Sequence, residues 1–191
     1  ASADQRKGRA GRTAPGSVIR LWGRNAPLEE RTPPEIQREE LVDLVLASAC
    51  VGTPVDTLVF PDPLPPATRQ RALDQLAALS AVDETGLATA RGLALSALPV
   101  DTFFAHLIMA LPDADAKGCM VDLAAALSAW RRPVTLPRGE EGRQVMGAWQ
   151  PQPCDATTLI QAVRQRPPPE LHPNLAARDE ARKLATQMRR T

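Results

Sequence analysis

The sequence contains no tyrosine, and aromatic residues make up only 3% of its 191 residues. This composition disfavours a broad surface of aromatic side chains on which nucleic-acid bases could stack. Long hydrophobic runs are also absent, because no apolar stretch approaches the roughly 20 residues that a membrane-spanning helix needs. The sequence therefore predicts a protein without a membrane partner.

Cysteine is scarce, and charge of one sign is not in excess. Cys50, Cys119 and Cys154 form no Cys-x-x-Cys pair, so neither a disulfide framework nor a metal site is expected. A reducing cytoplasm fits this cysteine usage best. Lys and Arg total 23 against 22 Asp and Glu, so net charge indicates neither a nucleic-acid nor a membrane partner. The length allows one large domain or two small ones.

Proline, in contrast, is abundant, with 19 residues spread between apolar blocks. Because proline interrupts helices, this distribution favours a series of short helices over a disordered chain. Apolar residues at helical spacing support the same interpretation. The predicted helices cover approximately residues 34–50, 66–80, 92–98, 101–111, 113–130, 139–149, 155–165 and 176–190.

Two stretches predict a small β component. The run SVIRLW at residues 17–22 predicts one strand, with Val18, Leu21 and Trp22 as its buried residues. The turn-rich stretch 82–89 predicts a small hairpin. Two helices followed by a hairpin within about 60 residues is the order of a winged helix, and the later helices predict a bundle. The predicted fold class is therefore mainly α with a small β part.

The same periodicity indicates which side chains are buried. The expected core includes Leu41, Leu44, Val45, Leu73, Leu76, Leu79, Leu107, Leu111 and Leu123. Trp130 and Trp149 each end a predicted helix and are expected to pack against the bundle. The basic end of the sequence is typical of a solvated face, although an electrostatic handle for RNA fits equally, with Arg178, Arg182, Lys183, Arg189 and Arg190 as its cations.

The segment QRKGRAGR, residues 5–12, carries the most distinctive chemistry. Glycines permit close backbone approach, and arginines three residues apart can converge their guanidinium groups on one polyanion. An arginine placed in this way stabilises the charge on a phosphoryl group in transfer, so the residue types suit an arginine finger acting in trans. A flexible basic loop explains the same residue types equally well.

QRKGRAGR resembles motif VI of the DEAH-box helicases, Q-R-x-G-R-A-G-R, at every fixed position. Similar segments follow in the family's order, namely TAPGSVIRLW, PPEIQREELVDLVL, FPDPLPP and ALDQLAALSAVDETGLATARGLALSALPVD. Trp22 and the later WQPQPCDATTLIQAVR are most similar to the bacterial HrpB-type branch. The resemblance extends along essentially the whole chain and is specific up to about residue 113. Among the departures, Ser80 stands where the family usually has glycine, and Asp101 remains able to cap the next helix.

The resemblance implies three parts. Residues 1–31 would be the C-terminal end of a second RecA-like domain, residues 32–91 a winged helix, and residues 92–191 a ratchet-like helical bundle. The family's phosphate loop, G-x-x-x-x-G-K-[ST], and its D-E-x-H box do not occur in this sequence. Together with the abrupt start of the sequence, this leads us to expect a piece of a longer helicase.

The family hydrolyses ATP between two RecA-like domains and moves along RNA. By resemblance, Arg9 and Arg12 would reach the γ-phosphate, and Gln5 would place the attacking water or the phosphate. Arg6 would be structural or would face nucleic acid. ATP and Mg²⁺ belong to the complete helicase, and this chain alone is expected to bind neither and to lack ATPase activity. Its expected partners are RNA and the upstream RecA-like domains of the same parent protein.

The accessory domains of the family imply contacts to RNA, mainly through phosphate and sugar. The candidate contacts are Arg69, Arg71, Arg91, Arg131 and Arg132, although a solvated charge on a helix surface is the more common explanation for each. Two other function classes remain open. A free-standing winged-helix nucleic-acid-binding protein would explain the order of elements but would leave QRKGRAGR as a coincidence. A protein-interaction module would use the Ala- and Leu-rich helical surface.

Overall fold

A computed structural model describes residues 2–23, 25–27, 33–135, 139–152 and 154–191. Within these ranges the regular structure is helical, and eight of the nine α-helices lie where the sequence predicts helices. They are α1 (Ser2–Lys7), α2 (Val42–Cys50), α3 (Pro66–Ala78), α4 (Ala90–Ser96), α5 (Thr102–Ala110), α6 (Ala114–Ser128), α7 (Glu140–Trp149), α8 (Asp155–Arg164) and α9 (Leu175–Met188). Three 3₁₀ turns accompany them, η1 (Glu35–Gln37), η2 (Val55–Thr57) and η3 (Pro169–Leu171).

Polar side chains fix the beginnings of several helices. Asp101 accepts a hydrogen bond from the backbone N–H of Phe103, which confirms the predicted cap of α5. Thr89, Asp113 and Asn174 cap α4, α6 and α9 in the same manner. These local contacts explain why sequence patterning locates the helices well.

The helix predicted for residues 34–50 is shorter than expected. It begins at Val42, and only η1 precedes it. Arg38, Glu39 and Glu40 are exposed, so no apolar contact holds another helical turn against the core. The predicted boundary between residues 31 and 32 lies outside the described residues.

The strand predicted for residues 17–22 does not form. No strand partner faces it in the described structure, and a lone strand leaves its backbone hydrogen-bonding groups unpaired. Its expected buried residues are instead exposed, at 46% for Val18, 92% for Leu21 and 41% for Trp22. The sequence also gave no sign of α1, which occupies part of the expected loop.

The predicted hairpin is reduced to one antiparallel bridge between Val82 and Ala88. Asp83 closes its turn by accepting hydrogen bonds from the backbone N–H groups of Thr85 and Leu87. Thr89 still donates its backbone N–H to the carbonyl oxygen of Ala81 over 3.0 Å, and its side chain caps α4, which begins at the next residue. The β component of the described residues is therefore this single bridge. Just before it, Ser80 has a φ of 54°, the left-handed conformation for which glycine is best suited.

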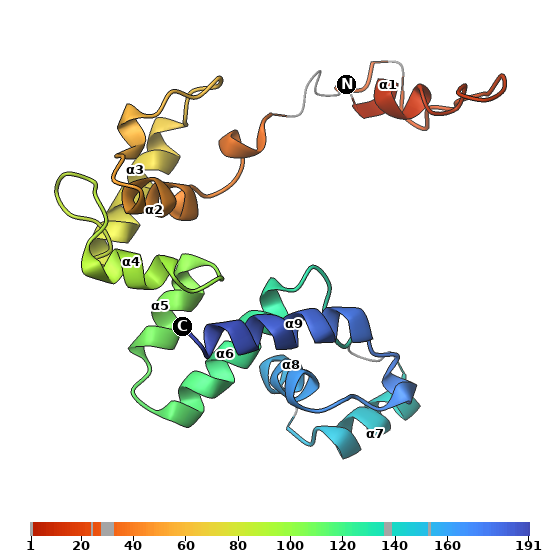
Figure 1. Ribbon diagram of the computed structural model, residues 1–191. Helices are drawn as coiled ribbons and strands as arrows, with labels where there is room; N and C mark the ends of the chain where they lie inside the picture. Colours follow the sequence, from red (N-terminus) through yellow and green to blue (C-terminus); the bar gives the residue numbers. More distant parts are fainter. Residues whose placement is uncertain (1, 24, 28–32, 136–138, 153) are drawn as a thin grey trace.

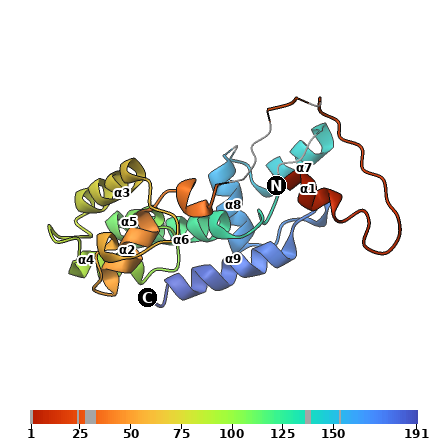
Figure 2. The same ribbon diagram turned by 90° about the horizontal axis from the view of Figure 1, so that it is seen from above.

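The helices from α2 onward pack into one elongated body, and the N-terminal segment, residues 2–23, lies apart from it (Figure 1). At one end α2 packs against α3 and α4, and α4 packs against α5. At the other end α6 packs against α8 and α9, and the view from above shows α9 running along this end of the body (Figure 2). A smaller cluster beneath α7 joins Val134, Met146, Ala162 and Leu171.

The main core extends through both ends of this body. The buried side chains of α6 and α9 are largely alanine, including Ala124, Ala125, Ala181 and Ala185, and these two helices make the most extensive contact of any helix pair in the described structure. Small side chains allow helix axes to approach closely. This contact fixes α9 against the rest of the bundle.

The predicted core is largely confirmed. Leu41, Val45 and Leu76 are buried, and Leu44, Leu73, Leu79 and Leu123 are partly buried against the same cluster. Leu111 is half-buried. The prediction for Leu107 is wrong, because its side chain is 46% exposed. Helix α5 instead buries Thr102, Ala105 and Ile108, which places Leu107 on its outer face.

Candidate functional site

The arginine-rich segment forms a short helix followed by a turn. Gln5 lies in α1, and Arg9 lies in the turn that continues it, where its N–H donates to the carbonyl oxygen of Arg6 over 3.1 Å. Arg12 lies in the bend that follows this turn. The side chains of Gln5, Arg9 and Arg12 are all exposed. The structure therefore presents these predicted site residues to solvent without enclosing them in a cleft.

Glycine is required where the chain folds back on this turn. A Cβ atom at Gly16 would lie 1.9 Å from the carbonyl oxygen of Ala10, closer than any side chain permits. Gly16 belongs to the T-x-P-G stretch that follows the arginine motif. That stretch therefore passes close to the turn between Arg9 and Arg12.

The arginines of this segment differ in their partners. Arg20 forms an ion pair with Asp4 at 2.9 Å. Within the described structure no carboxylate lies at ion-pairing distance from Arg9 or Arg12. Among the described residues no side-chain partner occupies their guanidinium groups, and this donor set suits the oxygens of an external phosphate.

The two predicted nucleic-acid contacts on α3 already have intramolecular partners. Arg69 pairs with Asp56 at 2.6 Å, and Arg71 lies 3.7 Å from Glu40. These ion pairs offset the positive charge of α3. This arrangement does not suit α3 as the recognition helix of a free-standing winged-helix protein, which would need uncompensated cations.

The other predicted contacts lie on separate elements. Arg91 on α4 places a guanidinium nitrogen 3.1 Å from Nδ1 of His106. Arg131 stacks over the ring of Trp130 at 4.5 Å, and Arg132 beside it is exposed. The structure thus distributes the five predicted arginines over α3, α4 and the end of α6 instead of gathering them.

The predictions for the two tryptophans have different outcomes. Trp130 is 70% exposed, so the expectation that it packs against the bundle is wrong. The chain leaves the helix at Ala129, which directs Trp130 away from the core. Trp149 is half-buried against the cluster beneath α7, as expected.

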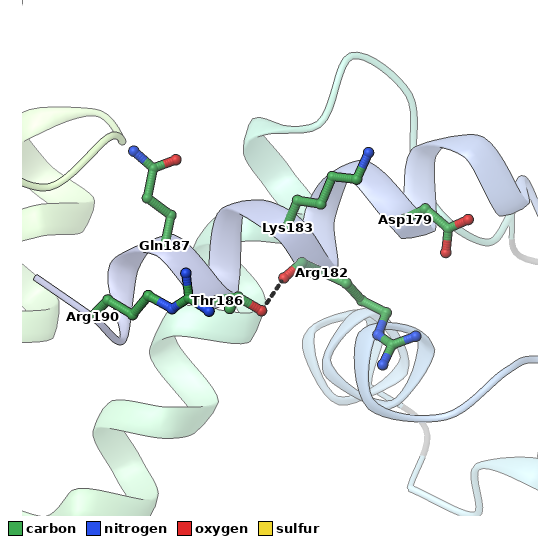
Figure 3. Close-up of a pocket in the computed structure, with 6 residues that line it drawn as sticks. All are labelled: Asp179, Arg182, Lys183, Thr186, Gln187 and Arg190. Atoms are coloured by element: carbon green, nitrogen blue, oxygen red, sulfur yellow. Dashed lines mark hydrogen bonds between the residues drawn. The ribbon is translucent and has the colours of Figure 1, made fainter.

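A basic groove follows α9, and its significance was only partly visible in the sequence. Figure 3 shows residues that line this open groove of about 640 Å³, namely Asp179, Arg182, Lys183, Thr186, Gln187 and Arg190. Residues four apart on a helix lie above one another. Arg182, Thr186 and Arg190 therefore form one row and Lys183 and Gln187 a second, a signal that helical spacing could have supplied.

Arg178 does not belong to the solvated face expected for this end of the sequence. It is only 8% exposed, and its Nε donates to the carbonyl oxygen of Ala162 over 2.8 Å. Burial lowers the pKa of its guanidinium below the ordinary value. Its Nη1 lies 3.7 Å from Asp179, so Arg178 offsets the one acidic side chain that lines the groove.

A buried carboxylate anchors two further cations beside the groove. Asp122 on α6 is 1% exposed and accepts hydrogen bonds from Arg164 on α8 and Arg189 at the end of α9. The hydrogen bond to Asp122 raises the pKa of Arg164. These residues, with Arg182 and Thr186, line an adjoining cavity of about 220 Å³. Asp122 thereby joins three helices and orients two arginines.

Two general features complete the description. In the part of the chain that the structure describes, no three His, Cys, Asp or Glu side chains gather where they could hold a metal ion. No helix among those residues combines the length and the apolar character that crossing a bilayer demands.

Comparison with known proteins gives one detailed result. No protein-family model matches the sequence. The fold is similar to the crystal structure of the E. coli DExH-box NTPase HrpB, with a TM-score of 0.64 and 20% sequence identity. The similarity covers 98% of this chain but only 20% of the HrpB chain, so this chain spans about a fifth of that protein. The described residues share the helical fold of a portion of a DExH-box NTPase.

Proposed function

We propose that this chain is the C-terminal part of a DEAH-type ATP-dependent RNA helicase. In this proposal the N-terminal segment supplies arginine fingers, and the helical body supplies the winged-helix and ratchet-like domains that contact RNA and couple ATP hydrolysis to translocation. The observation that carries it is the match of QRKGRAGR to motif VI together with the solvent exposure of Arg9 and Arg12. The fold shared with part of a DExH-box NTPase supports it independently.

The chemistry assigned to the segment follows from charge. ATP with Mg²⁺, held by upstream domains, would supply the phosphoryl group. Arg9 and Arg12 would donate to its oxygens and offset their charge, and Gln5 would orient the attacking water. Arg20 is less suited to this role because Asp4 already compensates it. The chain alone lacks a phosphate loop, so it provides only a part of the nucleotide site.

The exposed run at residues 17–22 also fits this function. Its β-branched and apolar side chains favour a strand, yet it has no strand partner in the described structure. An upstream RecA-like sheet would pair its backbone and cover Val18, Leu21 and Trp22. Docking of this strand would bring the adjacent arginine turn to the nucleotide.

The test is ATPase activity of this chain mixed with a separately expressed upstream fragment that carries the phosphate loop and the D-E-x-H box. Mixing should produce RNA-stimulated activity, and Arg9→Ala or Arg12→Ala should each reduce kcat by about 1,000-fold, the usual contribution of an arginine finger. Lys7→Ala is the matched control, because Lys7 occupies the variable position of the motif and should leave kcat within about twofold.

Two results of the mixing experiment would contradict this proposal. If the two pieces associate but Arg9→Ala and Lys7→Ala have the same kcat as the unmodified chain, the finger assignment is wrong. If they do not associate, the strand proposed for residues 17–22 has no partner in that fragment.

A further inference from the structure

The groove along α9 resembles the arginine turn at residues 9–12, and differs from α3, in the partners that its cations have in the described structure. Arg182, Lys183 and Arg190 have no carboxylate of the described chain within ion-pairing distance. Asp179 at its edge is partly offset by Arg178. By contrast, Arg69 and Arg71 on α3 are paired with carboxylates. Three cations without a carboxylate partner in the described structure therefore lie between residues 182 and 190, although the chain as a whole carries a formal net charge of only +1.

The side chains of the groove have distinct positions and hydrogen-bonding roles. Lys183 and Gln187 project to one side of α9 and Arg182 to the other in Figure 3. The hydroxyl of Thr186 donates to the carbonyl oxygen of Arg182 over 2.8 Å, which leaves the amide of Gln187 as a neutral donor. The cavity at Asp122 continues the groove through Arg182 and Thr186, and its two further arginines, Arg164 and Arg189, are paired with Asp122.

We propose that this groove binds the sugar–phosphate backbone of single-stranded RNA independently of base sequence. From Arg182 to Arg190 the path along the helix rises about 12 Å. That length accommodates a short run of successive phosphates of one strand. The arginines present their guanidinium forks to phosphate oxygens, and Gln187 donates to a phosphate or a ribose hydroxyl.

The lining of the groove argues for nucleic acid over two other polyanionic partners. Its six side chains are all polar or charged. Among the described lining residues an acidic peptide meets no aliphatic or aromatic residue to anchor it, and a lipid surface meets none that inserts among acyl chains. None of the six is aromatic, so they offer bases no stacking surface and contact the backbone instead.

The choice of RNA as the ligand rests on the proposed helicase function, whereas the proposal that the groove binds an anion rests on the residues of α9 alone. The two proposals fail separately, because the binding measurement needs neither ATP nor the upstream fragment. A helicase in which α9 does not bind RNA would still show the loss of activity in Arg9→Ala and Arg12→Ala.

The test uses the 191-residue chain and a fluorescein-labelled single-stranded RNA of 20 nucleotides and mixed sequence. Fluorescence polarisation gives Kd at several salt concentrations. The triple variant Arg182→Gln, Lys183→Gln, Arg190→Gln should weaken binding at least about tenfold and lower the slope of log K against log salt by about 2, since each phosphate contact on a single strand contributes about 0.7. A poly-uridine and a poly-adenosine probe should give equal losses.

The matched control is Arg38→Gln, Lys117→Gln, Arg143→Gln, which removes the same charge from exposed positions to which no RNA contact is assigned. It should leave the slope unchanged, because none of the three lines the groove. Circular dichroism establishes that both triple variants retain the helical fold, as expected for side chains outside the core.

Two results would overturn the proposal. In the first, the α9 variant keeps the Kd and the salt slope of the unmodified chain, or the control loses as much as the α9 variant. In the second, polyglutamate or anionic phosphatidylserine vesicles compete with the RNA as well as unlabelled RNA does at equal charge, which would make α9 a docking surface for an acidic protein or a membrane.

Discussion

The N-terminal segment and the helical body differ in how far their side chains are buried and in how specific their sequence motifs are. Every described side chain from Asp4 to Gly23 is exposed, whereas the body buries a continuous core from Leu41 to Met188. Yet the segment contains the most specific motif in the chain. The arginine motif can therefore match a functional pattern at every fixed position without contributing to the stability of this chain. Such a pattern is suited to a partner.

A matched pair of leucines should give the largest contrast between the two regions. Leu76 is fully buried and Leu21 is 92% exposed. Leu76→Ala should lower the free energy of unfolding by about 2–5 kcal/mol through lost burial and the cavity it leaves. Leu21→Ala should change it by less than about 0.5 kcal/mol. Urea titration followed by circular dichroism measures both, and a comparable loss in Leu21→Ala would show that the segment packs on the body in solution.

A matched set of ion pairs should give the next effect. Arg164→Ala with Arg189→Ala leaves Asp122 buried without a cation and should destabilise the body by about 2–3 kcal/mol. This is less than for a fully buried pair, because the two arginine side chains are 46% and 45% exposed. Arg20→Ala removes only the exposed pair with Asp4 and should cost at most about 1 kcal/mol. Equal losses in the same urea titration would contradict the distinction.

A matched pair of glycines should give the smallest contrast. A Cβ atom at Gly92 would lie 2.0 Å from the carbonyl oxygen of Ala81, and one at Gly16 would lie 1.9 Å from that of Ala10. Gly92→Ala should cost about 1–3 kcal/mol, because the packed body can relax only partly. Gly16→Ala should leave Tm unchanged, since the exposed segment can separate without uncovering a core. Differential scanning calorimetry distinguishes them, and a lower Tm in Gly16→Ala would place that turn within the cooperative unit.

The positions of the helices could be predicted from sequence because proline and capping residues act locally. The strand at residues 17–22 could not, because its formation depends on a partner that the described chain does not provide. Helix α5 is apolar on several sides, so periodicity did not decide that Ala105 and Ile108 would face inward and Leu107 outward.

The candidate site could be predicted from the sequence where its residues form one contiguous motif. QRKGRAGR is such a case, and the roles of Gln5, Arg9 and Arg12 stay predictions. The distribution of free cations was not predictable, because a sequence does not state which arginine meets a carboxylate. Arg69 pairs with Asp56 and Arg178 turns inward, whereas Arg182 and Arg190 remain available at the surface.

The alanine-rich contact between α6 and α9 has a mechanical consequence. Large buried side chains can change rotamer and absorb a displacement, but alanine has no side-chain torsion through which to yield, and close-packed interiors are nearly incompressible. The two helices should therefore move together as one unit. A larger side chain is the change that this contact tolerates least, and Ala181→Leu should push α6 and α9 apart.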